Sequence, residues 1–532
     1  MQKTYDYIVV GGGSAGSVLA ARLSEIPANN VLLIESGRRD SNPWIHIPAT
    51  FFKVLDQGRD AIVYAGEPDT GLNGRPTLVR QGHVLGGGSS VNAMIYIRGH
   101  ADDYNTWSQL GCRNWSYDKV LPVFRELEGN ARLGGPYHGT TGPLRVSDHR
   151  FVHPLSAAFV QAAQEAGLPF TVDFNGAAQL GAGFYQTTTH AGRRWSAAQA
   201  FLREARHRPN LTLMTGRRVA RVVFDGKRAT AITLDDGTQI GCLQEIALTA
   251  GALATPKLLM LSGVGPGEHL RSHGIPVVAD LAGVGENYQD HLQVPVQGET
   301  HAPISLLGAD KGLTGARHML HYLLTRHGLL TSNIVESGAF ADTTGSGQPD
   351  IQFHVLPLLA GYIDRAAEPG HGISISPCLL RPRSRGTVKL RSSDPREPAL
   401  FQANSLADPS DLEVLTRGLE LGIRILDQPA LQRVLKRRVL PKPGIEADPE
   451  ALRDYVRAMA KTVYHPAGTC KMGPASDRTA VVGEDLCVRG LEGLRVCDNS
   501  IMPRLVSGNT NAPAIMIGER AARFMLGREM LA

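Results

Sequence analysis

Features that would place the chain in a membrane or on nucleic acid are missing from its 532 residues. No run of about eighteen uninterrupted apolar residues occurs, so no membrane-spanning helix is expected. The polar residues 1–7 lack the basic and apolar regions of a secretory signal. The net charge is only +5, and Arg381, Arg383 and Arg385 form no more than a short basic loop. The chain is therefore not expected to bind nucleic acid.

Cysteine pairs and metal-ligand clusters are also missing. The six cysteines are widely spaced and include no C-x-x-C pair: Cys112, Cys242, Cys378, Cys470, Cys487 and Cys497. This spacing predicts neither a zinc site nor a disulfide framework, and it fits a reducing cytoplasm best. Cys470 lacks an activating arrangement and is interpreted as a small packed residue. No histidine pair with a carboxylate has metal-ligand spacing, so no metal is expected, and no G-x-S-x-G elbow indicates a serine hydrolase.

The composition is that of a globular protein with many glycines. Hydrophobic residues make up 42% and charged residues 20% of the chain, which argues against disordered and fibrous classes. The length allows two to four ordinary domains or one large one. The 59 glycines gather in a few motifs, and these motifs hold most of the information about function.

The first 35 residues predict a βαβ unit. An apolar run at Tyr7–Val10 is stopped by the glycines at 11–13, and a helical stretch follows over residues 14–24. Pro27 ends that helix, and a second apolar run, Val31–Ile34, is closed by Glu35. Continuous apolar runs are typical of parallel strands buried on both faces.

Later segments fall into two kinds. Glu245–Ala250 and Leu494–Val496 predict further buried strands, whereas Ile351–Leu356 and Thr387–Leu390 alternate and predict antiparallel strands. No repeat or linker separates the two kinds of segment. We therefore expect a nucleotide-binding domain assembled from several stretches, with a second domain inserted between them.

The glycine triplet Gly11-x-Gly13-x-x-Gly16 lies where a dinucleotide-binding motif belongs, between a buried strand and a helix. The first glycine permits the tight turn, the second lets a pyrophosphate approach the backbone, and the third brings helix and strand together. Glu35 ends the second strand and is placed to accept hydrogen bonds from a ribose diol. The alternative is a glycine-rich structural turn, which leaves Glu35 unexplained. The triplet alone does not distinguish FAD from NAD.

A second glycine-rich loop, Gly82–Asn92, allows close backbone approach to a bulky planar or phosphorylated ligand. With this loop the chain resembles the glucose/methanol/choline (GMC) oxidoreductase family almost end to end, and most closely its bacterial branch of choline, alcohol and L-sorbose dehydrogenases. The other matching motifs lie at residues 138–144, 251–265, 283–291, 381–386, 465–473, 498–503 and 509–511.

The resemblance implies an α/β fold, α+β overall: a Rossmann-like FAD-binding domain with an inserted substrate domain built on an antiparallel β-sheet with helices. The expected FAD-binding domain comprises residues 1–150, 196–299 and 456–532. The expected substrate domain comprises residues 151–195 and 300–455.

The same resemblance implies where FAD binds. The ADP half would lie against Gly11, Gly13, Ser14, Ala15, Gly16 and Glu35. Adenine would contact the backbone of Val219, and Asp498 would contact the ribityl-pyrophosphate region. Gly86, Gly87 and Asn92 would line the flavin, with Asn509, Thr510 and Asn511 along the isoalloxazine. His83 stands where the family more often has Arg or Lys. Val91 stands where covalent members have a histidine, so FAD is expected to be non-covalent.

By resemblance, His465 and Asn509 are the catalytic pair. A histidine with a pKa near neutrality is suited to take the hydroxyl proton, an asparagine can hydrogen-bond the developing alkoxide, and flavin N5 accepts the hydride. His291, His354 and His100 are interpreted as structural or substrate-lining.

These features predict an FAD-dependent alcohol dehydrogenase or oxidase that converts a primary alcohol, polyol or sugar to an aldehyde or ketone. Electrons would pass to O2, a quinone or another redox partner. Two alternatives stay open at this point: an FAD-containing lyase of the same fold family, and a non-catalytic flavoprotein. Bleaching of the flavin by added alcohol would distinguish an alcohol-oxidising enzyme from the lyase. A non-catalytic flavoprotein would be expected to have lost His465 or Asn509, and this chain has both.

Overall fold

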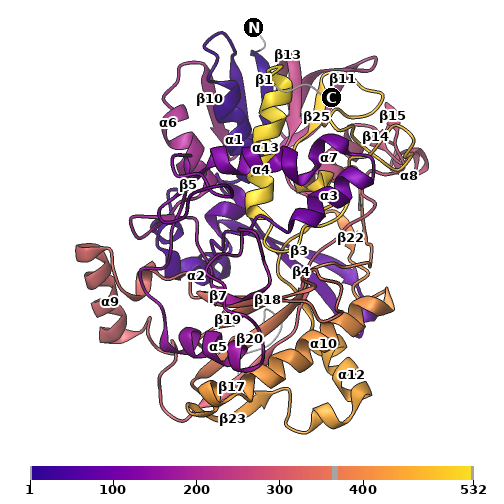
Figure 1. Ribbon diagram of the computed structural model, residues 1–532. Helices are drawn as coiled ribbons and strands as arrows, with labels where there is room; N and C mark the ends of the chain where they lie inside the picture. Colours follow the sequence, from indigo (N-terminus) through magenta and orange to yellow (C-terminus); the bar gives the residue numbers. More distant parts are fainter. Residues whose placement is uncertain (1–2, 362–369, 529–532) are drawn as a thin grey trace.

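A computed structural model describes residues 3–361 and 370–528 of the chain. Two β-sheets organise it, a seven-stranded one near the termini and an eight-stranded one at the opposite end (Figure 1). The strands of the first sheet are, in spatial order, β10 (Leu211–Thr215), β2 (Val31–Glu35), β1 (Thr4–Val10), β13 (Gln239–Leu248), β12 (Arg228–Leu234) and β11 (Val219–Asp225), with β25 (Leu494–Val496) beside β13.

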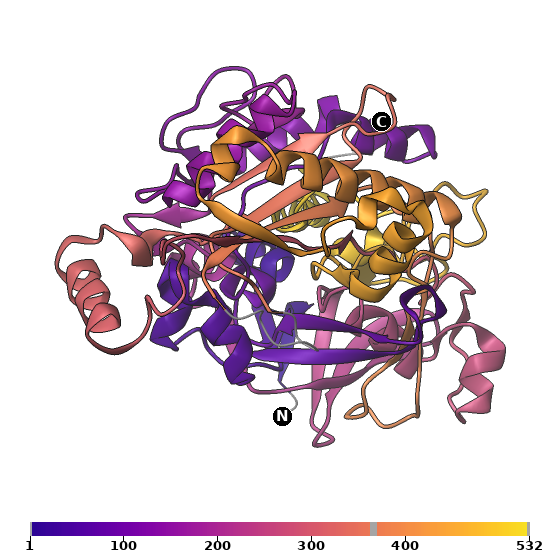
Figure 2. The ribbon, with the colours of Figure 1, turned by 90° about the horizontal axis from the view of Figure 1, so that it is seen from below.

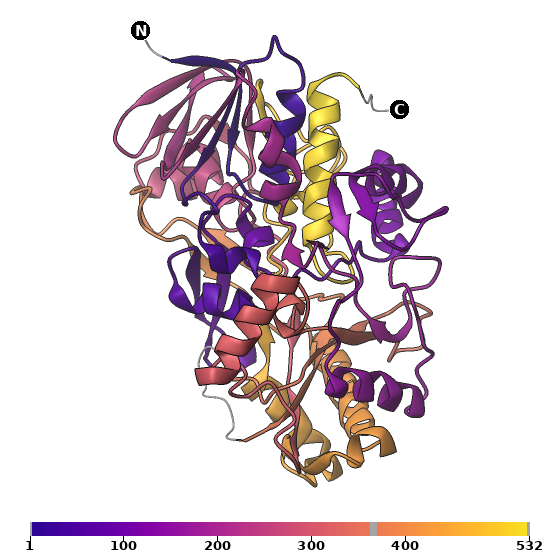
Figure 3. The same ribbon diagram turned by 90° about the vertical axis from the view of Figure 1, so that its left-hand side faces the viewer.

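The centre of the first sheet is parallel and buried, as the continuous apolar runs predict. β1 lies between β2 and β13 and is parallel to both, and Ile8 and Val9 are fully buried. Helix α1 (Ser14–Leu23) connects β1 to β2, and the C-terminal helix α13 (Asn511–Met525) packs beside it (Figure 3). The antiparallel strands β11 and β12 extend one edge. The expected βαβ unit is confirmed.

The second sheet is antiparallel throughout. Its strands are, in spatial order, β23 (Leu435–Leu440), β17 (Val296–Thr300), β20 (Gly372–Leu379), β19 (Ile351–Leu356), β18 (Ser337–Ala341) and β7 (Gly181–Phe184), with β16 (Leu292–Gln293) pairing both β20 and β24 (Lys461–Thr462). Helix α10 (Pro409–Leu426) lies across this sheet (Figure 2), and α5 (Pro154–Glu165) packs on the same core. Residues 351–356 form the expected antiparallel strand, but every residue of it is buried, since both of its faces are covered.

The two sheets divide the chain differently from the expected domain boundaries at two points. β16 and all but the last residue of β17 precede residue 300, and β24 follows residue 455, yet all three strands belong to the antiparallel sheet. After β7 the chain therefore returns to the second sheet near Leu292 and leaves it near Thr462. Strands of two residues are too short to produce a periodic pattern, so the sequence did not reveal these crossings.

The remaining elements surround the two sheets. Short strands pair as β3 (Ala61–Pro68) with β4 (Pro76–Gly82), β5 (Glu128–Asn130) with β6 (Leu144–Val146), β8 (Thr189–His190) with β9 (Arg193–Arg194), β14 (Val264–Gly265) with β15 (Ala279–Asp280), and β21 (Thr387–Lys389) with β22 (Leu400–Gln402). The other α-helices are α2 (Phe51–Gln57), α3 (Ala101–Gln109), α4 (Tyr117–Leu127), α6 (Arg203–Ala205), α7 (Ala254–Leu261), α8 (Gly267–Ser272), α9 (Gly312–Thr325), α11 (Pro429–Gln432) and α12 (Pro449–Met459).

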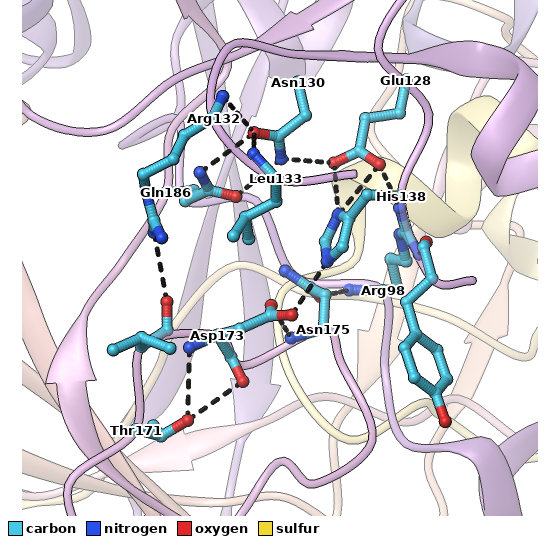
Figure 4. Close-up of polar contacts among 12 residues, drawn as sticks. Arg98, Glu128, Asn130, Arg132, Leu133, His138, Thr171, Asp173, Asn175 and Gln186 are labelled. Carbon is cyan, nitrogen blue, oxygen red and sulfur yellow. Dashed lines mark hydrogen bonds and ion pairs between the residues drawn. The ribbon is translucent and has the colours of Figure 1, made fainter. Parts of the chain in front are cut away.

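A buried polar network fixes the chain just after the second glycine-rich loop (Figure 4). Arg98 forms an ion pair with Glu128, both essentially inaccessible to solvent, and also donates to the carbonyl oxygen of Tyr137. His138 Nδ1 lies 3.1 Å from the Glu128 carboxylate, and His138 Nε2 lies 2.9 Å from Asp173. Charges buried this deeply require such partners. The network thus explains the His138 motif as a structural feature.

Candidate active site

A cavity of about 1020 Å³ lies between the two sheets. Val10 and Ser14 line it from the first sheet and its helix, and His354 and Leu356 line it from the second. Such a volume is at the upper end of ligand sites, so the cavity can hold a molecule as large as a dinucleotide together with a small substrate.

Glu35 occupies the end of the cavity beside β2. Its carboxylate accepts the backbone N–H groups of Gly12 and Gly37, both at 2.7 Å. Burial raises the pKa of Glu35, although the two N–H groups oppose the shift. A carboxylate has about four lone-pair positions, so Glu35 can still accept from a ribose diol. Val219 and His83 line the same end, where His83 Nε2 lies 3.0 Å from Ser36 Oγ.

Two helix N-termini meet at the middle of the cavity. Ser14 begins α1 and donates its hydroxyl to Asn511 Oδ1 at 2.8 Å, and Asn511 begins α13. Neither helix has a side-chain cap or an acidic residue in its first turn. Their free N–H groups and dipoles therefore favour an anion such as a pyrophosphate.

The glycines bring the backbone walls close together. A Cβ on Gly16 would lie 1.9 Å from the Gly11 carbonyl oxygen, so only glycine lets α1 approach β1 this closely. A Cβ on Gly87 would lie 2.7 Å from the Cα of Gly13, which shows that the two glycine-rich loops touch. Gly86 donates its N–H to the Gly12 carbonyl at 2.7 Å. Gly16 and Gly86 shape the cavity without lining it.

Asn92 presents its amide nitrogen to the cavity because its oxygen is occupied. Asn92 Oδ1 accepts from Met94 N and from Arg194 Nη1, both at 2.9 Å. Arg194 is fully buried, donates also to the carbonyls of Ile45 and Ser89, and has its pKa lowered by burial to about 9. The sequence did not single out Arg194, which acts on the cavity only through Asn92.

These residues fit FAD. The two uncapped helix N-termini suit its pyrophosphate, and Glu35 suits the adenosine ribose. A Cβ on Gly88 or Gly251 would meet nothing within 4 Å, so open space for a planar group lies beside both. Asn499 Oδ1 is buried without a hydrogen-bond partner on the same wall. Asp498 is placed nearby, where it accepts from Gly251 N at 2.8 Å and Thr255 Oγ1 at 2.7 Å.

Strand pairing brings together two histidines that are 174 residues apart. His291 immediately precedes β16 and His465 follows β24 by three residues, and these two strands pair with Leu292 opposite Thr462. As a result, the two Nδ1 atoms are 2.9 Å apart, and the rings are nearly perpendicular, at 88°.

The hydrogen-bond chain fixes the tautomer of His465. His291 Nε2 lies 3.0 Å from the Leu380 carbonyl oxygen, which only accepts, so the His291 proton resides on Nε2. His291 Nδ1 must then accept the hydrogen bond from His465 Nδ1–H. In neutral His465 the remaining nitrogen, Nε2, is therefore unprotonated and can accept a hydrogen bond.

Asn509 faces that nitrogen. Gln352 Nε2 donates to Asn509 Oδ1 at 3.1 Å, which turns the Asn509 amide nitrogen toward His465 Nε2 at 3.4 Å. Gln352 is held in turn by Tyr185, whose hydroxyl donates to the Phe353 carbonyl and accepts from Gln352 at 3.2 Å. The site thus presents one hydrogen-bond acceptor and one donor side by side, the complement of an alcohol hydroxyl.

Asp290 binds the backbone of both histidines. Its Oδ1 accepts the backbone N–H of His465 at 2.8 Å and that of His291 at 2.9 Å. Its Oδ2 accepts from the hydroxyls of Tyr288, at 3.1 Å, and Thr462. Burial raises the pKa of Asp290 to about 6 despite these hydrogen bonds.

Burial keeps the histidines of the site uncharged. It lowers the pKa of His465 well below the ordinary value, and the nearby His291 and His354 lower it further. Burial also lowers the pKa of His291 to about 3 and that of His354 to about 4. At neutral pH His465 is therefore a neutral base rather than an imidazolium.

The structure gathers most of the predicted site residues around this cavity. Those that line it are Gly11, Gly13, Ser14, Ala15, Glu35, Gly87, Asn92, Val219, His465, Asp498, Asn509, Thr510 and Asn511. His354 lines it as well, and its Nδ1 is buried without a partner. His100 instead caps α3. Gln352, Asp290 and Arg194 support the site without having been predicted to do so, whereas His291 had been interpreted as structural or substrate-lining.

Residues 3–361 and 370–528 contain neither a metal-ligand cluster nor a membrane-spanning helix. No group of His, Cys, Asp and Glu side chains there could hold a metal ion. No helix in those ranges is long and apolar enough to span a membrane. Cys470 is fully buried, and burial raises its pKa well above the ordinary value, so it is a packed residue.

Comparisons with known proteins agree with this geometry. Family models described as GMC oxidoreductase match residues 5–293 and 382–518. The chain is 42% identical over 540 residues to an alcohol dehydrogenase (acceptor) of Pseudomonas putida, covering 98% of this chain and 96% of that protein. It is 40% identical over 531 residues to an oxygen-dependent choline dehydrogenase of Brucella ovis, covering 99% and 96%. Pyridoxine 4-oxidase from Mesorbium loti superposes with a TM-score of 0.88 at 32% identity over 98% of each chain.

Proposed function

The chain belongs to the GMC oxidoreductase family, and from that premise we propose that His465 and Asn509 handle the hydroxyl group of its substrate. The protein is an FAD-dependent oxidoreductase that oxidises alcohols, as its relatives do. The observation that carries the proposal is the pairing of the unprotonated His465 Nε2, an acceptor, with the Asn509 amide nitrogen, a donor, 3.4 Å away.

Each residue has one task. The substrate hydroxyl donates to His465 Nε2 and accepts from Asn509 Nδ2. As the carbinol C–H bond breaks, the hydroxyl proton passes to His465, Asn509 stabilises the charge on oxygen, and a C=O bond forms. Bound FAD supplies the acceptor of the hydride. His291 keeps Nδ1 of His465 protonated, so that the unprotonated Nε2 always faces the substrate side.

We propose that FAD is held without a covalent bond. Val91 has no nucleophilic atom and packs against Ile45, Val54 and Val84 at the edge of the cavity. Glu35 would hold the ribose, the N-termini of α1 and α13 the pyrophosphate, and Gly87 and Asn92 the flavin.

Acid or heat denaturation of the purified yellow protein should release intact FAD into the supernatant. Flavin fluorescence that comigrates with denatured protein on a gel would show a covalent link and contradict this assignment.

The walls near the histidines favour an uncharged alcohol with an apolar substituent. Val335, Leu356, Leu358 and Ile95 line the cavity on the side of the second sheet. Among the described residues, the carboxylates that line it are Glu35, Asp56, Glu397 and Asp498. Asp56 is paired with Arg80 at 2.9 Å, and Glu35 and Asp498 bind backbone groups. These carboxylates therefore give little reason to expect a cationic substrate, and the apolar walls favour an alcohol with an apolar substituent.

An anaerobic panel of alcohols tests this proposal. Primary alkanols should bleach the bound flavin faster than sugars, polyols or choline at equal concentration. Faster bleaching by choline or a sugar would overturn the substrate class. Failure of every alcohol to bleach the flavin would instead favour the lyase or non-catalytic alternatives.

We further propose a cytoplasmic location and an acceptor that is O2, a quinone or another redox partner. The location is supported by six free cysteines, of which five are buried. Exposing the alcohol-reduced enzyme to oxygen or to a quinone analogue would identify the acceptor class by the rate of flavin reoxidation.

A further inference from the structure

Helix α9 exposes an apolar face to solvent. Leu313 is 90% exposed, Leu324 is 75%, Leu320 is 59% and Leu323 is 56%. Surface helices of globular proteins normally turn their apolar stripe toward the core. Here the only buried residue of the helix is Tyr322, so the usual arrangement is reversed.

The leucines form a continuous stripe. At 100° per residue, Leu313, Leu320 and Leu324 fall within about 40° of one another, and Leu323 lies beside them. Tyr322 projects from the opposite side and contacts Arg326, whose guanidinium lies 4.6 Å from its ring centre. The helix stands away from the body of the protein in both Figure 1 and Figure 2. The turn that follows it, Leu329–Thr331, is its main contact.

The surroundings of the stripe are basic. Lys311 and Arg317 are exposed at the start and along one edge of the helix, and Arg326 follows its end. Asp310 is the one acidic residue in the segment 310–328. Apolar residues on one face with basic residues at the margin are typical of helices that lie in the interface of an anionic bilayer.

A second copy of the chain fits this face poorly. The helix has 14 residues, so it is about 21 Å long and about 10 Å wide and offers roughly 200 Å². A stable dimer needs about 800 Å² per partner. A twofold contact would also bring the basic margins of the two helices together, with little acid to compensate.

We propose that α9 is a membrane-docking helix: its leucine stripe enters the outer part of an anionic lipid bilayer while Lys311 and Arg317 contact the headgroups. The association is peripheral, through a helix lying in the plane of the surface. None of the residues involved lines the cavity described above.

Vesicle sedimentation with the intact holoenzyme tests the proposal. The probes are vesicles of phosphatidylcholine alone and vesicles that also contain phosphatidylglycerol. The variants are L320Q/L324Q, which removes the stripe, and K311Q/R317Q, which removes the charge. Leu243→Gln is the matched control, because Leu243 is 62% exposed but lies on β13.

The parental enzyme should sediment preferentially with the anionic vesicles. L320Q/L324Q should bind either vesicle at least about tenfold more weakly. K311Q/R317Q should lose only the preference for anionic lipid, and Leu243→Gln should bind like the parent. All variants should keep full flavin content and the parental rate with a short water-soluble alcohol, which shows that they are folded.

Three results would overturn the proposal. The first is parental binding by L320Q/L324Q, and the second is no binding by the parent. The third is a parental dimer that L320Q/L324Q converts to a monomer without any effect on vesicles, which would assign the face to a second copy. None of these results affects the proposed chemistry, because that is measured separately through flavin bleaching.

Discussion

At the scale of single residues, the reactivity of His465 depends on where its proton lies. The Leu380 carbonyl oxygen, His291 and His465 form a hydrogen-bond chain. The Leu380 carbonyl fixes the proton position on His291, and His291 in turn fixes the proton position on His465. An imidazole held in the wrong tautomer cannot accept the hydroxyl proton, however well it is positioned. His291 is therefore a positioning residue for the base.

Replacing His291 tests this role. His291→Ala should slow flavin reduction by about one to three orders of magnitude, with little change in flavin content. His291→Gln should be slowed less, because an amide oxygen can accept the His465 Nδ1–H bond in place of the imidazole. The exposed His207 supplies the control variant, His207→Ala.

Stopped-flow reduction under anaerobic conditions gives the rate and the apparent substrate affinity separately. A tautomer defect lowers the limiting rate more than the affinity. If Ala and Gln variants were equally slow, or if only affinity changed, His291 would serve packing rather than proton placement.

The sequence predicted the residues to which the family resemblance assigns a role, and it missed the roles of residues that act through other residues. His465, Asn509 and Glu35 stood out by motif. His291 was interpreted as structural or substrate-lining, because nothing in a single sequence shows that residues 174 positions apart share a hydrogen bond. The sequence did contain one signal for the role of His291, namely the adjacent Asp290. A carboxylate next to a histidine in a glycine-rich motif indicates a polar network.

At the scale of elements, local patterns predicted the parallel strands and helix α1 well. Apolar runs ended by glycine leave few alternatives. The crossing points between the sheets were not predictable, because β16 and β24 are set by tertiary pairing rather than by their own composition. The exposure of the leucine stripe of α9 was not predictable either. The helical period shows that an apolar stripe exists, but not whether it faces the core or the solvent.

The buried network beside β5 makes a prediction about stability. Glu128→Gln leaves Arg98 and His138 without their shared carboxylate. Removing one partner of a buried ion pair costs about 3–5 kcal/mol in the free energy of unfolding. The control is Glu126→Gln on the same chain segment, because Glu126 is largely exposed and pairs only at the surface with Arg523.

Denaturant titration of the two holoenzyme variants provides the measurement. Glu126→Gln should change the free energy of unfolding by less than about 1 kcal/mol. Equal effects of the two substitutions would mean that the network is not a structural feature of the fold.

At the scale of the whole molecule, the buried neutral histidines predict acid sensitivity. The pKa of an unfolded histidine is about 6.5, whereas burial lowers that of His291 to about 3 and that of His354 to about 4. The unfolded chain therefore binds more protons as the pH falls below 6.5, and stability present above that pH is lost toward pH 4. His465 adds to this effect in the same direction.

Buried carboxyl groups oppose the trend in part. Burial raises the pKa of Asp290 to about 6 and also raises the pKa of Glu35, so their contributions are present in acid and are lost as the pH rises through the raised pKa. Burial opposes protonation of His138, but hydrogen bonds to Asp173 and Glu128 raise its pKa overall. Burial lowers the pKa of His149 to about 4, and with this histidine and the three of the site we expect the net effect to be destabilising in acid.

Melting curves of the holoenzyme between pH 7.5 and about 4.5 test the sign. Tm should fall by several degrees across this range, and His354→Gln should reduce the fall by removing one of the titrating groups. His207→Gln should leave the curve unchanged. A Tm that is constant or rises toward acid would show that the site histidines are not buried in neutral form.

The central claim is that His465, oriented through His291 and facing Asn509, takes the hydroxyl proton during flavin reduction. The most direct measurement is anaerobic stopped-flow reduction of His465→Ala, Asn509→Ala and the double variant by a good alcohol substrate. His465→Ala should keep its FAD but reduce it at least about a hundredfold more slowly. Asn509→Ala should be slowed less, and the two defects should not add, because both residues bind the same oxygen. Reduction of the His465→Ala flavin at the parental rate across neutral pH would contradict the account.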